Sequence, residues 1–120
     1  RNPNCVVVAH SLGSVIAADV LNEAIRAKDP LPVSGLVTIG SPLNILKLRH
    51  PMIKKFPFKW YDIYHPSDPV HAKGDLTIRK FKGAITRRLS RAEPYFVSHS
   101  SYWPSQIVAN IINTLTQKGS

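Results

Sequence analysis

The chain has 120 residues and a mass of 13.4 kDa, which suffices for one domain and excludes a two-domain enzyme. With 43% hydrophobic and 19% charged residues and only short apolar runs, its composition is neither that of a disordered chain nor that of a membrane span. The net charge of +9 keeps anionic partners under consideration, among them phospholipid headgroups, polyanionic substrates and nucleic acid. The single cysteine, Cys5, excludes an internal disulfide and lacks zinc-site spacing, so we expect it in the core.

The chain begins abruptly. Residues 1–4 lead straight into an apolar run, with neither an initiator Met nor a targeting segment before it. We therefore expect residues 1–120 to be a portion of a longer chain, and the localisation stays open.

Patterns typical of a strand, a helix and a second strand follow one another in the first third of the chain. Residues 5–9 form a continuous β-branched apolar run, typical of a parallel strand buried on both faces. From Ser14 to about Ala27, apolar residues recur at three- and four-residue spacing, which predicts an amphipathic helix. Residues 35–40 predict another buried strand. Together they predict a βαβ unit with a right-handed crossover.

The middle of the chain is less regular. We expect a short helix over residues 43–49 and a third strand over residues 60–65, which ends in turn-forming residues. Residues 73–93 are basic and are predicted to form a surface excursion, with a short strand near residues 76–78. A fourth strand is predicted at residues 95–97.

A last helix is predicted to open at Pro104 and to end before Gly119. Its apolar stripe consists of Ile107, Val108, Ile111, Ile112 and Leu115. The order of these elements predicts an α/β fold, with a mostly parallel sheet and flanking helices.

The segment AHSLG, from Ala9 to Gly13, stands where the first strand turns into the first helix. A sharp turn of this kind strains the central residue, lifts its hydroxyl out of the sheet edge and tolerates only small residues two positions away. Ser11 is therefore the candidate nucleophile, with Ala9 where the general G-x-S-x-G pattern has its first glycine. The backbone N–H of Leu12, at the positive end of the helix, is the candidate oxyanion donor.

The run VVVAHSLGSVIAADVL closely resembles the strand, elbow and helix of α/β-hydrolase fold serine hydrolases, especially lipase- and esterase-like members whose elbow begins with alanine. The resemblance covers essentially the whole chain and corresponds to the C-terminal half of that fold, without its first strands. It implies an acid and then a histidine, each on a loop after a strand. Asp68, in YHPSDPV, would be the acid, and His99, in VSHSSYW, would be the general base.

Other residues compete for these two roles. Asp62 and Asp75 are rival acids, although Asp62 lies inside the predicted third strand and not beyond its end. His10 directly precedes the nucleophile and is expected to pack in the turn. The remaining histidines come before or beside the acid: His50, His65 and His71.

The reaction that the resemblance implies is hydrolysis of a small-molecule or lipid ester through an acyl-enzyme on Ser11, with no metal or organic cofactor. Lipases, esterases, thioesterases, peptidases and acyltransferases share this constellation, so the substrate stays open. No segment before Cys5 could supply the second oxyanion donor or the first strands. We expect a missing N-terminal half, another copy or another chain to complete the sheet.

A second interpretation is a non-catalytic module that keeps the hydrolase scaffold and binds an anionic surface or partner through its basic residues. It predicts binding that weakens steeply with salt. A nucleic-acid-binding domain is a weaker hypothesis, because the basic residues are not interleaved with aromatic ones in any recognisable module.

Overall fold

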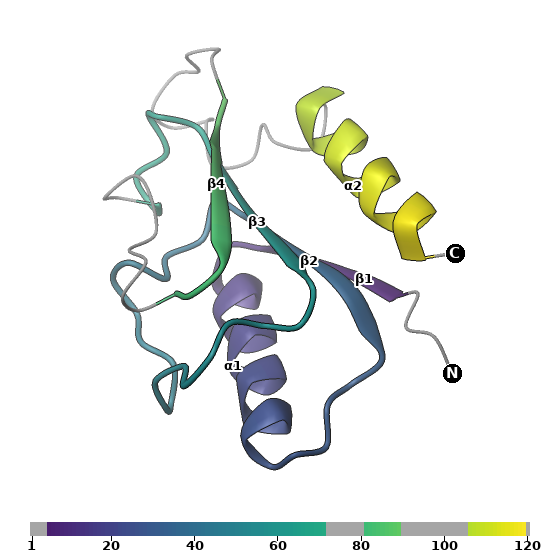
Figure 1. Ribbon diagram of the computed structural model, residues 1–120. Coiled ribbons are helices and arrows are strands. Elements are labelled where there is room, and N and C mark those ends of the chain that lie inside the picture. Colours follow the sequence, from purple (N-terminus) through teal and green to yellow (C-terminus); the bar gives the residue numbers. More distant parts are fainter. Residues whose placement is uncertain (1–4, 72–80, 90–105, 120) are drawn as a thin grey trace.

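The computed structural model describes residues 5–71, 81–89 and 106–119 (Figure 1). In this part of the chain, four parallel strands form one sheet in the order β1-β2-β3-β4, with two helices beside it. The elements are β1 (Cys5–His10), α1 (Leu12–Arg26), β2 (Val33–Ile39), β3 (Lys59–Tyr64), β4 (Ala84–Arg88) and α2 (Gln106–Gly119). The predicted α/β class, with a parallel sheet and flanking helices, is confirmed.

The two helices cover opposite faces of the sheet, so the domain has three layers (Figure 1). Side chains alternate across each strand, and neighbouring residues of β2 therefore enter different cores. Leu36 packs in the core with Ala18 and Leu21 of α1, whereas Val37 packs with Val108 of α2. β2 and β3 are consequently buried on both faces, as the continuous apolar run of β2 predicts.

The first strand departs from its prediction. The apolar run of β1 predicts a central strand, but β1 lies at an edge of the described sheet, where it pairs with β2 alone. Its residues are mostly half-buried, and Cys5 is exposed instead of lying in the core. A run of β-branched residues indicates that a strand favours burial. Full burial also requires a neighbouring strand on each side, and in the described sheet β1 has only β2.

Two expectations for the irregular middle of the chain are also wrong. Residues 43–49 contain a turn and no helix: the N–H groups of Ile45 and Leu46 both donate to the carbonyl oxygen of Pro42, and this single turn is not continued. The surface excursion predicted over residues 73–93 contains β4, which extends the sheet from its pairing with β3. The predicted strands at residues 76–78 and 95–97 lie outside the described residues, as does Pro104.

Five of the predicted elements keep their expected bounds to within about two residues: β1, α1, β2, β3 and α2. α1 ends because Lys28 adopts a left-handed conformation (φ 59°) just before Asp29 and Pro30. Within the described ranges, no helix combines the length and the apolar character needed to cross a membrane.

Candidate active site

In a parallel sheet all strands end on the same side, and the candidate site lies at these carboxyl-terminal ends (Figure 1). Ser11 follows β1 directly, and its N–H donates to the carbonyl oxygen of Ile39 at the end of β2 (2.9 Å). Asp68 follows β3. Since β2 alone separates β1 from β3, these two strands are about two strand spacings apart, roughly 10 Å.

The backbone of Ser11 has the strain that the predicted turn requires. Its φ is 57° and its ψ is −131°, a combination that costs a residue with a side chain about 1–3 kcal/mol. Serine at a helix N-cap normally accepts a hydrogen bond from the first turn, but the Ser11 side chain makes no such bond. The fold therefore holds a serine in a costly conformation and does not use its hydroxyl to cap α1.

Leu12 is the first residue of α1, so its backbone N–H has no carbonyl acceptor within the helix. This N–H group lies at the positive end of the helix dipole and belongs to the residue that follows Ser11. This is the environment that an oxyanion donor needs. A small residue at Gly13 is not enforced by crowding, because a Cβ added there would meet nothing within 4 Å in the described part of the chain.

Hydrogen bonds of two further serines stabilise the strained turn at Ser11. Ser14 is completely buried, and its Oγ lies 2.5 Å from the carbonyl oxygen of Ser11 and 2.6 Å from Oγ of Ser41. Ser41 Oγ in turn accepts from the N–H of Leu43 (3.2 Å). These bonds tie the start of α1 to the loop after β2. This role has no local signal in the sequence, because the pairing joins residues 27 positions apart.

Asp68 lies in a compact turn after β3 and is only 4% exposed. Its N–H donates to the carbonyl oxygen of His65 (3.0 Å), and its Oδ1 accepts from the N–H of Val70 (2.9 Å). An Asp side chain that binds the backbone two residues later is a common turn former. Here the same turn holds the carboxyl group at the strand ends.

The rival acid Asp62 is engaged elsewhere. It is fully buried in β3, where Oδ1 accepts from the hydroxyl of Thr38 (2.7 Å) and Oδ2 lies 2.8 Å from Nε2 of His71. Thr38 Oγ1 also accepts from Nε1–H of Trp60 (3.0 Å). Both Asp62 oxygens thus have buried partners, so Asp62 is less suited than Asp68 to hold a further histidine.

His71 closes the turn that carries Asp68. Its ring is 1% exposed and stacks on Tyr64, with 4.2 Å between centroids and 9° between planes. We assign the ring proton to Nε2, because Nε2 faces the Asp62 carboxylate and the buried Nδ1 has no hydrogen-bond partner. Asp62 and His71 therefore anchor the end of the Asp68 turn to β3. A polar residue among the buried apolar residues of each strand, Thr38 in β2 and Asp62 in β3, was the available sequence signal for this network.

The candidate base His99 lies outside the described residues, as does the rival acid Asp75. Two of the other histidines are engaged elsewhere: His50 binds Glu23 on α1, and His71 is held by Asp62. His10 ends β1 and the buried His65 directly follows β3, so both lie at the carboxyl ends of the strands. Among the described residues, no group of His, Cys, Asp and Glu side chains could hold a metal ion. No protein family, curated protein or solved structure was found to match the chain.

Proposed function

We propose that the chain belongs to a serine hydrolase of the α/β-hydrolase class that cleaves carboxylic esters. The observation that carries the proposal is the conformation of Ser11, which is strained, follows a buried parallel strand and is not used to cap the helix. Strain of this kind persists where the surrounding structure enforces it, and it is concentrated at functional sites. The resemblance of the elbow sequence to lipase- and esterase-like enzymes adds the reaction class.

The positions of the chain on both sides of His99 support its role as the base. The carboxyl-terminal end of β4 lies on the same side of the sheet as those of β1 and β3, and α2 begins near that side (Figure 1). His99 lies ten positions after Leu89 and seven positions before Gln106 in the sequence. Such lengths span up to about 35 and 25 Å, respectively, so the histidine can reach the interval between Ser11 and Asp68 from either side.

In the proposed reaction, His99 removes the hydroxyl proton of Ser11 as the oxygen attacks the ester carbonyl carbon. The Leu12 N–H stabilises the oxyanion of the tetrahedral intermediate. Collapse expels the alcohol, which takes the proton from His99, and leaves an acyl-enzyme on Ser11. Water, deprotonated by His99, then releases the carboxylic acid. Asp68 orients the imidazole and stabilises its charged form.

The test is hydrolysis of p-nitrophenyl esters by the full-length protein and by three variants: Ser11→Ala, Asp68→Asn and His99→Ala. We expect kcat to fall by about 10⁴- to 10⁶-fold in Ser11→Ala and His99→Ala. Matched controls outside the site are Ser34→Ala, Asp29→Asn and His50→Gln, each expected to keep near wild-type kcat. Turnover that survives Ser11→Ala, or an equal loss in Ser34→Ala, would contradict the proposal.

A further inference from the structure

Basic residues are unevenly distributed, and one long segment of the chain has no acid to balance them. Between Asp29 and Asp62 the sequence contains five Lys and Arg residues and no Asp or Glu. This segment includes the connection from β2 to β3, which passes beside α1 (Figure 1). The acids that could form ion pairs with these residues therefore lie on other elements.

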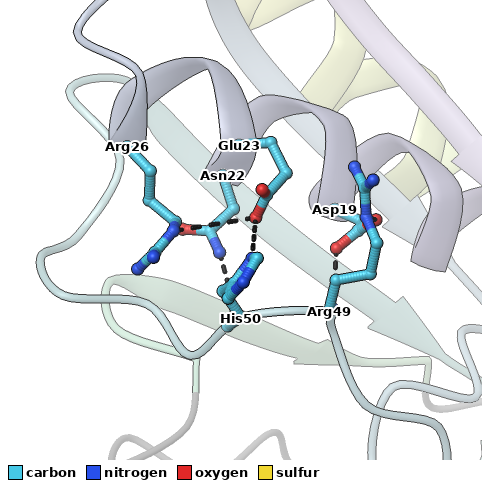
Figure 2. Close-up of polar contacts among 6 residues, drawn as sticks. All are labelled: Asp19, Asn22, Glu23, Arg26, Arg49 and His50. Atoms are coloured by element: carbon cyan, nitrogen blue, oxygen red, sulfur yellow. Dashed lines mark hydrogen bonds and ion pairs between the residues drawn. The ribbon is translucent and has the colours of Figure 1, made fainter.

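Acids on α1 neutralise only one part of this connection. Arg49 Nε pairs with Asp19 Oδ2 at 2.5 Å, and His50 Nδ1 lies 2.8 Å from Glu23 Oε2 (Figure 2). Asn22 also donates to the carbonyl oxygen of His50 (2.9 Å). Farther along the connection three lysines have no ion pair with a described residue: Lys54, Lys55 and Lys59.

Two of these lysines line a cavity of about 500 Å³ at the amino-terminal ends of β2, β3 and β4. Lys55, Lys59 and Lys82 contribute to its wall, and among the described residues no Asp or Glu side chain does. Aromatic rings form its apolar part, with Phe56 and Phe58 stacked at 5.0 Å between centroids. A wall whose charged side chains, in the part of the chain that the structure describes, are all lysines has the charge of a binding site for an anion.

The cavity is shaped by a close approach of two loops. Gly83 has a φ of +84°, and a Cβ at this position would lie 3.0 Å from Cβ of Lys55. Lys82 Nζ donates to the carbonyl oxygen of Ile53 (3.0 Å), which ties the turn before β4 to the lysine-rich connection. A left-handed glycine and a cross-loop bond therefore hold together the two loops that carry Lys55 and Lys82.

Exposed apolar side chains lie beside these lysines. Ile53 is 68% exposed, and Ile85, which lines the cavity, is 37% exposed. The aromatic rings are recessed by comparison: Phe56 is 3% and Trp60 1% exposed, and Phe58 is half-buried. Protruding aliphatic residues next to lysines suit a lipid surface, whereas single-stranded nucleic acid requires exposed aromatic rings for base stacking.

We propose that this lysine-lined cavity, together with Ile53, docks the protein on a membrane that contains anionic phospholipids. The ammonium groups of Lys55, Lys59 and Lys82 bind the headgroup phosphates and carboxylates, and the Ile53 side chain enters the interfacial region. The cavity lies at the amino-terminal ends of the strands, whereas Ser11 lies at the carboxyl-terminal end of β1. The surface therefore tethers the protein and leaves the candidate active site facing away from the bilayer.

Vesicle co-sedimentation with the full-length protein tests the proposal. Vesicles of phosphatidylcholine with phosphatidylserine should bind the protein, vesicles of phosphatidylcholine alone should not, and added salt should weaken the binding. Since each lysine near an anionic surface contributes about 1 kcal/mol, Lys55→Glu/Lys59→Glu should lose about 30-fold or more in affinity. The matched control Arg87→Glu/Arg88→Glu has the same change in charge at exposed positions of β4 and should stay within about threefold.

A second pair of variants tests the apolar contact. Ile53→Ser should weaken vesicle binding, whereas Ile45→Ser, a 54% exposed isoleucine of the same connection, should not. Circular dichroism on every variant verifies that the fold is retained. Equal binding to both kinds of vesicle, or equal losses in the two charge-reversed proteins, would overturn the proposal. Saturable binding of inorganic phosphate without vesicle binding would assign the cavity to a soluble anion and would also overturn it.

Discussion

The conformation of Ser11 separates two contributions of this residue, one to stability and one to chemistry. A glycine adopts φ 57° and ψ −131° without the steric cost that any side chain incurs. We therefore predict that Ser11→Gly unfolds at a higher urea concentration than Ser11→Ala, by a free-energy difference of about 1 kcal/mol, although both variants lack the nucleophile. Equal unfolding midpoints would show that the turn is not strained.

Residues that define the site differ in how well the sequence predicts them. Ser11 was identified correctly as the strained residue of a strand-to-helix turn, because small residues and a change of hydrophobic period mark that turn locally. The support that it receives from Ser14 and Ser41 was not predicted. Such bonds depend on which loops meet in three dimensions, and serine is common in turns for many reasons.

At the scale of the elements, the Asp68 turn is held by the buried pair of Asp62 and His71. We predict that His71→Ala destabilises the protein by about 3 kcal/mol, since it leaves the Asp62 carboxylate buried with one partner missing. His71→Gln retains an N–H donor and should recover part of that loss in urea unfolding.

The same variants distinguish a positioning role from a merely structural one. If the pair orients the Asp68 turn, His71→Ala lowers kcat with KM nearly unchanged, and His71→Gln restores part of the kcat. A variant that is less stable but has wild-type kcat, assayed well below its unfolding temperature, would contradict the positioning role.

The elements themselves were predictable where their side chains are buried. β2, β3 and both helices follow from hydrophobic periodicity, which the two cores of the molecule require. β4 was missed because its residues are largely exposed and basic, so the strand is defined by pairing with β3 and not by its own pattern. The buried bond between Thr38 and Asp62 depends on the register of β2 and β3.

At the scale of the whole molecule, apolar surface remains uncovered beside the edge strand β1. Leu12, Ile16 and Val20 repeat every fourth residue along one side of α1 and are 55%, 59% and 46% exposed. An edge strand next to an apolar helix face is prone to pair with another chain. This is the surface that we propose is covered by further strands of the hydrolase fold.

We therefore predict that the 120-residue chain, produced alone, self-associates in size-exclusion chromatography with light scattering. Ile16→Lys/Val20→Lys should shift it towards the monomer, because charged side chains disfavour burial of the α1 stripe. The control Ile45→Lys removes an exposed isoleucine elsewhere and should leave the association unchanged. A monodisperse, protease-resistant wild-type monomer would contradict the proposal that this surface needs a partner.

The most direct measurement for the central claim is the position of a covalent adduct. A fluorophosphonate probe reacts with serines activated by a neighbouring base, and peptide mass spectrometry locates the modified residue. We predict a single adduct on Ser11 of the full-length protein, abolished in His99→Ala and unaffected in His50→Gln. Labelling at another serine, or none on the folded protein, would contradict the assignment of Ser11 as the nucleophile.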